Sequence, residues 1–365
     1  MDFPVKVGIV GCGKIAPAYI ENLKGNLSGS VEIVACSDLD AEHTRAFAEE
    51  HGIPKACSTE ELLAIDEIEI ALNLTPAPAH YVLSKMILNA GKHLFTEKPL
   101  SVDLVEAREL LSIAKEKGLL LAGAADTFLG GGLQLCRKMI EEGKIGEAIA
   151  ANCVVTVPLR EDRRYHEVFK GANLDLGPYY VAALVHLFGP VEKVSARAPK
   201  RFPSKTDAAT GETFDVEYPS TVSAVFEFGN GLTSTYIATQ DVHGYYPRIE
   251  VLGTGGKLTL NDANFYTGDV ILDSYTDPGT IVPSEEDGYV TLKRGLGVAE
   301  MALALREKRE PLASGELMYH VLEVLHAVFD SAASGQAVEI DSRPEQPQPF
   351  SLEAVNTIRS EVAAQ

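Results

Sequence analysis

The feature that most constrains the fold of this chain is a glycine-rich segment near its start. Residues 11–16 read G-C-G-K-I-A and directly follow an apolar run at residues 7–10. In a strand–turn–helix unit the first glycine allows a tight turn, the second lets the backbone approach a pyrophosphate, and a small third residue allows close helix–strand packing. Because the helix N-terminus then faces the phosphates, the segment predicts dinucleotide binding rather than a tight turn without a ligand. The predicted contacts are Gly11, Gly13, Lys14 and Ile15.

Strands and helices alternate through the first 122 residues. Short apolar runs predict strands over residues 5–10, 32–36, 68–74, 93–96 and 119–122. Amphipathic patterns predict helices over residues 15–27, 41–51, 79–90 and 102–117, the last with Ser101 as its N-cap. Strands that are apolar on both faces and separated by helices are typical of a parallel sheet covered on both sides. We therefore expect a Rossmann domain over residues 1–122.

The pattern changes in the second domain, expected over residues 123–365. Small or apolar residues alternate with polar ones between residues 222 and 238, and Gly229-Asn230-Gly231 splits this run as in a β-hairpin. A second strand pair is predicted at residues 248–252 and 257–260. We expect an antiparallel sheet with one exposed face, long loops at 199–219 and 266–295, a helix around 317–328, and an extended tail at 343–349 before a last short helix.

Composition excludes several classes of protein. With 45% hydrophobic and 23% charged residues, the chain is typical of a globular protein rather than a disordered or fibrous one. A formal net charge of −20 argues against nucleic acid or an anionic membrane as partner. The longest apolar stretch, residues 118–125, is far short of the ~20 residues that span a bilayer. The five cysteines contain no C-x-x-C pair, and no His or acid cluster has metal spacing, so we expect a cytoplasmic protein with reduced cysteines and no metal.

An acidic residue marks the end of the second predicted strand. Asp38 is expected to accept hydrogen bonds from the adenosine ribose hydroxyls, and its carboxylate would repel a 2′-phosphate. The neighbouring Leu39 offers no basic replacement. The sequence therefore favours NAD over NADP as the cofactor.

Three further motifs follow in a characteristic order. Residues 75–80 read T-P-A-P-A-H after one predicted strand, residues 97–99 read E-K-P after the next, and residues 175–179 read D-L-G-P-Y. In this order, with the glycine-rich turn and Asp38, the motifs resemble those of the glucose–fructose oxidoreductase / inositol dehydrogenase (Gfo/Idh/MocA) family. Segments 142–147, 187–191 and 252–256 continue the resemblance, which thus covers most of the chain.

The resemblance implies an α/β fold of two domains. The first is a Rossmann dinucleotide-binding domain, and the second is an α/β domain with a large, mainly antiparallel open sheet that often forms the subunit interface. A homodimer or homotetramer is therefore expected. Lys98 matches the family's catalytic lysine. The remaining contacts to the cofactor are assigned to Thr75, Pro76, His80, Glu97 and Lys98.

The chain departs from the inositol dehydrogenase branch of the family in its later motif. That branch reads D-x-G-x-H-x-x-D, with the histidine as acid/base, whereas here Tyr179 stands in the histidine position and Ala182 in that of the second acid. Glucose–fructose oxidoreductase, xylose dehydrogenase and dimeric dihydrodiol dehydrogenase show D-x-G-x-Y at this place. Thr127 also stands where many members have an arginine. The pocket contacts of that arginine therefore cannot be assigned to this chain.

The chemistry of these residues agrees with hydride transfer from an alcohol, which needs a group to remove the hydroxyl proton. A tyrosine with a pKa near 10 is a poor base at neutral pH, but a nearby ammonium favours its phenolate. Lys98 can supply that charge, and Tyr179 can relay the proton. Asp175 can orient the lysine or a sugar hydroxyl, or instead cap the helix that leads into Tyr179. His80 lines the cofactor side or caps its own helix, and Tyr165 and His166 either reach the substrate or lie in a surface loop.

These features predict an NAD(P)-dependent oxidoreductase that transfers a hydride between nicotinamide and a secondary alcohol or ketone of a sugar, cyclic polyol or glycoside. A non-enzymatic dinucleotide or sugar sensor is one alternative, but such a protein would not need both Lys98 and Tyr179. A dihydrodiol dehydrogenase is the other alternative, and it would share the same tyrosine.

Overall fold

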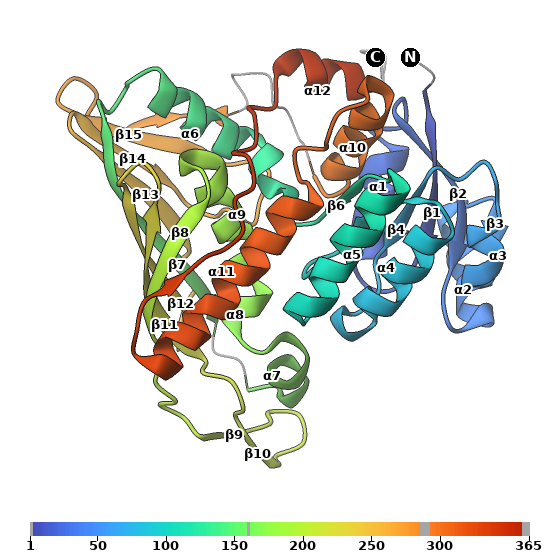
Figure 1. Ribbon diagram of the computed structural model, residues 1–365, viewed down its shortest axis with the longest axis horizontal. Coiled ribbons are helices and arrows are strands. Elements are labelled where there is room, and N and C mark those ends of the chain that lie inside the picture. The colour runs from blue at the N-terminus through green and yellow to red at the C-terminus, as the bar shows by residue number, and fades with distance from the viewer. Residues whose placement is uncertain (1–2, 159–160, 285–292, 360–365) are drawn as a thin grey trace. The chain divides into compact units, whose positions relative to one another are not determined.

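The chain folds into two compact units in the computed structural model, which describes residues 3–158, 161–284 and 293–359 (Figure 1). Unit 1 consists of Met1–Leu129, Leu292–Tyr319 and Phe350–Gln365, and unit 2 of Gly130–Thr291 and His320–Pro349. The boundary expected at residues 122/123 lies close to the end of the first segment of unit 1. Two C-terminal segments also belong to unit 1, so the chain does not divide at a single point.

Unit 1 contains a six-stranded parallel sheet with the order β3-β2-β1-β4-β5-β6. Its strands are β1 (Val5–Val10), β2 (Val31–Ser37), β3 (Lys55–Ala56), β4 (Ile70–Asn73), β5 (His93–Thr96) and β6 (Leu121–Gly123). The strand order reverses between β1 and β4. In open α/β sheets, ligands bind beyond the carboxyl ends of the strands at such a switch point.

Helices pack around this sheet, and the alternating sequence pattern predicted four of them, over residues 15–27, 41–51, 79–90 and 102–117. The helices are α1 (Ala16–Lys24), α2 (Ala41–His51), α3 (Thr59–Leu63), α4 (His80–Asn89), α5 (Leu104–Lys117), α10 (Leu296–Glu307) and α12 (Leu352–Ile358). Figure 1 shows α4 and α5 side by side, and their residues are in contact. Helix α10 packs on β6 and on the short 3-10 helix that follows it (Asp126–Leu129), where the backbone N–H of Gly297 donates to the buried Asp126 carboxylate at 2.9 Å. This contact explains why a C-terminal segment belongs to unit 1.

The predicted N-cap of α5 is wrong by two residues. The cap is Asp103, whose side chain accepts hydrogen bonds from the backbone N–H groups of Val105 and Glu106. Ser101 lies two residues before this cap, where its hydroxyl donates to the Glu106 carboxylate and accepts from the N–H of Asp103. A carboxylate that reaches the first-turn N–H groups satisfies donors that the helix leaves unpaired.

Unit 2 is built on a nine-stranded sheet with the order β16-β15-β14-β13-β7-β12-β11-β8-β17. The strands are β7 (Ala148–Pro158), β8 (Val191–Arg197), β11 (Thr221–Phe228), β12 (Thr233–Val242), β13 (Arg248–Gly253), β14 (Gly256–Leu260), β15 (Val270–Ser274), β16 (Thr280–Val282) and β17 (Val338–Glu339). The pair β7–β12 is parallel and the other pairs are antiparallel. The hairpin β11–β12 and the pair β13–β14 confirm the sequence prediction.

Both stretches predicted as long loops contain strands. Residues 199–219 include the two-stranded pair β9 (Ser204–Thr206) and β10 (Thr213–Asp215), and residues 266–295 include β15 and β16. The apolar residues Val270 and Leu272 are buried on the inner face of the sheet. The prediction failed because these strands are short and lie between polar turns. Residues 285–292 of the second stretch lie outside the described part.

One face of the large sheet is covered by helices, and the other is exposed. The covering helices are α6 (Gly131–Glu141), α8 (Ala172–Asp175), α9 (Gly177–Phe188) and α11 (Gly315–Ser334). Along β11, Val222, Ala224 and Phe226 are buried, whereas Ser223 and Val225 between them are exposed. This alternation confirms the one-sided burial predicted from the sequence. Within the described residues, no helix is long and apolar enough to span a membrane.

Acid is expected to destabilise unit 2 through His320. The ring Nε2 of this buried histidine accepts the backbone N–H of Val191 at 3.0 Å, and Nδ1 lies 2.7 Å from the Ser342 hydroxyl oxygen. Protonation would place a second donor against Val191. Burial, with help from Arg343, accordingly lowers the pKa of His320 from 6.5 to about 4.

Because the pKa is depressed in the folded state, the stabilisation is present above pH 6.5 and is lost as the pH falls from 6.5 toward 4. The full loss corresponds to roughly 3 kcal/mol. The free energy of unfolding, measured with urea across this pH window, should fall less with acid in His320→Gln than in the wild type. Glutamine keeps an acceptor for the Val191 N–H but does not titrate. An unchanged acid dependence in the variant would rule out this role for His320.

Candidate active site

The glycine-rich loop lies at the carboxyl end of β1 and has the geometry of a phosphate cradle. Gly11 adopts φ +102°, and a Cβ there would lie 2.9 Å from the carbonyl carbon of Leu74 and from Cγ2 of Thr75. Gly13 is exposed, and no atom lies within 4 Å of the place where its Cβ would be. Gly11 therefore allows the turn, and Gly13 leaves open space for close approach of a ligand to the backbone. This observation fits a dinucleotide.

Asp38 follows β2 and is joined to the same loop. Its two carboxylate oxygens accept the backbone N–H groups of Cys12 and Leu39, each at 2.7 Å. The side chain of Leu39 is fully exposed. Each carboxylate oxygen retains lone-pair capacity for a ribose hydroxyl. The sequence predicted a binding role for Asp38 but not this second role, in which it fixes the position of the glycine-rich loop.

A buried asparagine that the sequence analysis missed organises the turn after β4. The Asn73 side-chain oxygen accepts from the Thr75 hydroxyl at 2.6 Å, and its amide nitrogen donates to the His80 carbonyl and the Ser84 hydroxyl, both at 3.0 Å. These bonds shape the turn that holds Thr75 and Pro76. The sequence does contain a signal for this role, because Asn73 is a polar residue at the end of an otherwise apolar strand. A buried side-chain amide needs hydrogen-bond partners nearby.

His80 joins the turn after β4 to the E-K-P segment after β5. Its Nδ1 lies 2.6 Å from the Pro99 carbonyl oxygen and its Nε2 lies 2.6 Å from that of Thr75. Burial lowers the pKa of the ring and outweighs the two carbonyl contacts, which favour the charged form and raise it. The helix-cap interpretation is wrong, because the N-cap of α4 is Ala79 and both ring nitrogens face carbonyl oxygens rather than N–H groups.

Glu97 and Lys98 lie at the carboxyl end of β5. The backbone N–H of Glu97 donates to the Asn73 carbonyl at 2.9 Å. One oxygen of its carboxylate accepts from the Tyr19 hydroxyl at 2.8 Å, and the other accepts from the backbone N–H of Lys98 at 3.1 Å. Glu97 is buried and Lys98 is half-buried. Unit 1 thus brings the predicted cofactor residues and Lys98 together at one edge of its sheet.

Unit 2 holds Tyr179 and Asp175 on two consecutive helices. Helix α8 ends at Asp175, helix α9 begins at Gly177, and Tyr179 lies buried in the first turn of α9. The N-cap of α9 is Leu176, and no side chain caps it, so the interpretation of Asp175 as a cap is wrong. The Asp175 carboxylate instead accepts from the Tyr165 hydroxyl at 3.0 Å.

Tyr165 and His166 belong to helix α7 (Arg163–Phe169), and both are buried, so the surface-loop interpretation is wrong. The Gln240 amide nitrogen lies 3.1 Å from His166 Nδ1, and the Gln240 oxygen accepts the N–H of Ala172 at 2.7 Å. Gln240, which is buried near the end of β12, was not among the residues predicted from the sequence. Unit 2 therefore connects α7 to α8 through hydrogen bonds on both Tyr165 and His166.

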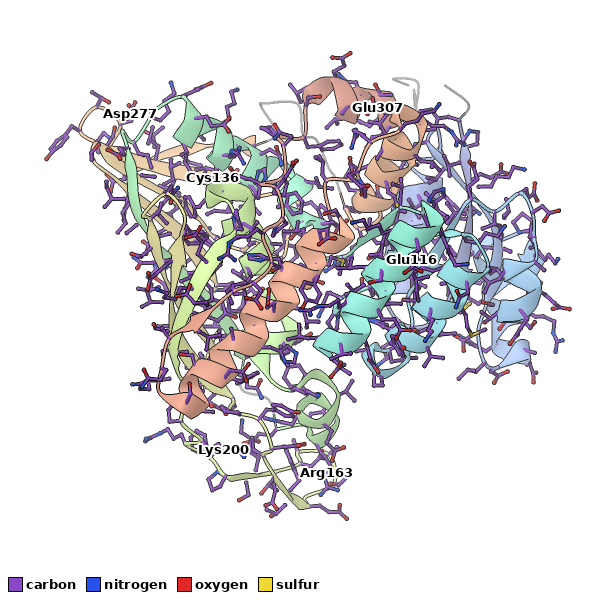
Figure 2. All side chains as sticks on the ribbon, in the orientation of Figure 1. Glu116, Cys136, Arg163, Lys200, Asp277 and Glu307 are labelled. Atoms are coloured by element: carbon purple, nitrogen blue, oxygen red, sulfur yellow. The ribbon has the colours of Figure 1, made fainter. Side chains whose placement is uncertain are left out.

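The β9–β10 pair supports this helix. The backbone N–H of Arg163 donates to the Asp207 carboxylate at 2.8 Å, and the ring of Phe214 lies 5.3 Å from that of His166. Figure 2 shows Arg163 and Lys200 in the same part of unit 2, where α7 and the β9–β10 pair lie. The insertion predicted as a loop thus fixes the helix that carries Tyr165 and His166.

Comparison with known proteins agrees with this organisation. Residues 5–124 match the family model described as "Oxidoreductase family, NAD-binding Rossmann fold", and residues 133–259 match the "GFO/IDH/MocA C-terminal domain". The first match covers the parallel sheet of unit 1, and the second covers most of the first segment of unit 2, from α6 into β14.

Individual relatives match over most of the chain. Trans-1,2-dihydrobenzene-1,2-diol dehydrogenase from Oryctolagus cuniculus is 25% identical over 327 residues, which are 86% of this chain and 95% of the relative. dTDP-3,4-didehydro-2,6-dideoxy-alpha-D-glucose 3-reductase from Streptomyces violaceoruber is 28% identical over 268 residues, 71% of this chain and 73% of the relative.

A solved structure shows the same fold. Levoglucosan dehydrogenase in complex with NADH and levoglucosan superposes with a TM-score of 0.82 at 20% identity, covering 93% of this chain and 100% of that protein. Both domain models, the parallel and open sheets, and the order of the motifs agree. The chain belongs to the Gfo/Idh/MocA oxidoreductase family, whose first domain is an NAD-binding Rossmann fold.

Proposed function

We propose that this oxidoreductase transfers a hydride between NAD and a secondary alcohol or ketone of a sugar, cyclic polyol or glycoside. The observation that carries the proposal is the position of Lys98 just after the carboxyl end of β5, on the same sheet edge at which the glycine-rich loop follows β1. The names of the three relatives refer to a cyclic diol, a sugar nucleotide and levoglucosan. Such compounds carry the hydroxyl or keto groups that this chemistry requires.

The cofactor residues proposed are the glycine-rich loop, Asp38, and the turn that holds Thr75 and Pro76. NAD, when bound there, supplies the acceptor for the hydride, while the protein supplies position and charge. Lys98 is proposed to hydrogen-bond the substrate oxygen and Tyr179 to relay its proton. Asp175, Tyr165 and His166 are proposed to position the substrate. This division of roles rests on the motifs and on acid–base chemistry.

A dihydrodiol dehydrogenase is the second candidate, because the Oryctolagus cuniculus relative matches 86% of the chain. The test is a substrate panel containing levoglucosan, myo-inositol, aldoses, sugar nucleotides and a trans-dihydrodiol, with reduced nicotinamide absorbance as the readout. Turnover of a sugar or polyol supports the proposal, whereas turnover of only the aromatic diol supports the second candidate. NAD binding without turnover of any compound would instead support the sensor.

Cofactor preference is expected to depend on Asp38 and Leu39. The wild type should prefer NAD, because the Asp38 carboxylate accepts ribose hydroxyls and repels a 2′-phosphate. Asp38→Ser combined with Leu39→Arg should move the kcat/KM ratio toward NADP. Since Asp38 also holds the N–H of Cys12, the double variant should lose part of its total activity as well. A wild-type preference for NADP would contradict the assignment.

The exposed face of the large sheet is proposed to form a homodimer or homotetramer. The outward side chains of Val225 and Ile237 are 41% and 40% exposed on neighbouring strands, and apolar surface of this kind favours burial by a partner. Light scattering should give a multiple of the 39.3 kDa chain mass, and a mass of one chain would contradict the proposal. The cytoplasm is the proposed location, supported by five cysteines that are all free.

A further inference from the structure

We propose that Tyr19 and Glu97 form a positioning pair that holds the backbone of Lys98 in place for catalysis. The inference rests on the proposed function, because it requires Lys98 to be the catalytic lysine. The sequence predicted Glu97 as a contact to the cofactor. In this proposal Glu97 instead acts on catalysis through its neighbour Lys98.

The Tyr19 hydroxyl is held in a fixed place. Tyr19 lies in α1 with no solvent exposure, and its ring packs edge-on against that of Phe95 in β5, with 6.2 Å between centroids and 70° between planes. The hydroxyl donates to Glu97 at 2.8 Å. A tyrosine that is packed on all sides can orient an acceptor because its own rotamer is fixed.

Glu97 is oriented by that hydroxyl toward the backbone of Lys98. A buried carboxylate is costly unless it accepts hydrogen bonds, and this one accepts from Tyr19 and from the N–H of Lys98. Both oxygens therefore have protein donors. The arrangement explains the buried acid without a contact to the cofactor.

The segment is also held on the other side of Lys98. The Pro99 carbonyl lies 2.6 Å from the His80 ring, and the ring reaches the Thr75 carbonyl at the same distance. Lys98 is thus the half-buried residue between two fixed neighbours. Misplacement of a reacting group by about 1 Å can cost roughly 10²-fold in rate, so this fixation matters for turnover.

The pair connects the lysine with the cofactor loop. Tyr19 belongs to the helix that begins at Ala16, directly after the glycine-rich turn. Removing the hydroxyl should leave the turn and the Asp38 contacts unchanged, because Tyr19 takes no part in the hydrogen bonds of Asp38 to Cys12 and Leu39. Tyr19→Phe should therefore lower kcat about tenfold or more while the Kd for NADH stays the same.

The test uses Tyr19→Phe and Glu97→Gln in the wild type and in a Lys98→Ala background. Glu97→Gln leaves one oxygen for two donors and should lower kcat by roughly 10–100-fold. The double variant should lose no more kcat than the more damaging single variant, because both substitutions disrupt the same hydrogen-bonded pair. In the Lys98→Ala background, neither substitution should lower single-turnover rates further.

Tyr81→Phe is the matched control, since Tyr81 also donates its hydroxyl to a glutamate, Glu109, in unit 1. It should leave kcat and the Kd for NADH unchanged. The pH profile of kcat should shift in Tyr19→Phe in the same direction as in Lys98→Ala, and it should not shift in Tyr81→Phe.

The possible failures are distinguishable. If Lys98→Ala keeps wild-type turnover, the proposed function of Lys98 is wrong. If Lys98→Ala is inactive but Tyr19→Phe and Glu97→Gln both keep wild-type kcat, the positioning pair alone is wrong. If the kcat losses of Tyr19→Phe and Glu97→Gln add in the double variant, or if either substitution lowers the rate further in the Lys98→Ala background, the two residues have a structural or cofactor-binding role. Either result would overturn the inference.

Discussion

Lys98→Ala is expected to reduce kcat by roughly 10²–10⁴-fold, the scale of losing positioned proton-transfer chemistry. The Kd for NADH should change little, because the proposed contacts to the cofactor come mainly from the glycine-rich loop and Asp38. Steady-state kinetics and NADH fluorescence titration measure the two quantities separately. Lys85→Ala is a suitable control, since Lys85 lies on α4 in a solvent-exposed ion pair with Glu109.

Lys98→Ala should also move the pH profile of alcohol oxidation. An ammonium near the tyrosine favours the phenolate and lowers the pKa of the phenol. Without that ammonium, the apparent pKa that governs oxidation should rise. A wild-type kcat, or a kcat loss matched by an equal loss of NADH affinity, would contradict a catalytic role for Lys98.

Tyr179→Phe is expected to lower kcat by roughly 10²–10⁴-fold with little effect on folding. The change removes one oxygen from a ring that is buried in the first turn of α9, so the packing of the ring is retained. The measurement is the pH profile of kcat at saturating substrate for the wild type and the variant. The limb of this pH profile that reflects ionisation of the catalytic base should disappear in the variant.

The neighbouring Tyr180 provides a control for Tyr179. Its hydroxyl donates to Asp262 at 2.6 Å, and burial raises the pKa of this phenol. Tyr180→Phe should lower the stability of unit 2 by roughly 1–3 kcal/mol because the bond to a carboxylate is lost, with kcat within about threefold of the wild type. If Tyr179→Phe behaves like this control, Tyr179 is a packing residue.

The sequence was sufficient for the core of both sheets. Strands β1 and β5 match their predicted bounds because each is a buried apolar run ended by polar or turn residues. The hairpin β11–β12 was predictable because Asn-Gly tolerates the turn geometry. Strands β3 and β16 were missed because two or three residues carry no measurable periodicity.

The contacts within the site were less predictable than its residues. Tyr19 and Glu97 are 78 positions apart, and the partner of His80 on the E-K-P segment is 19 positions away. Local patterns do not encode such pairs, because they arise when parallel strands bring their carboxyl ends together. The membership of α10 in unit 1 escaped prediction for the same reason, since its buried partner Asp126 is distant in the chain.

Hydride transfer from a carbinol carbon to NAD can be followed directly with an isotope. The most direct test of the proposed function is to incubate the protein with NAD and the best substrate of the panel carrying deuterium on its carbinol carbons, and to analyse the nicotinamide product by mass spectrometry. We expect reduced nicotinamide that retains the deuterium, formed far more slowly by Lys98→Ala and Tyr179→Phe. Reduced nicotinamide without deuterium, or none with any substrate of the panel, would contradict the proposed function.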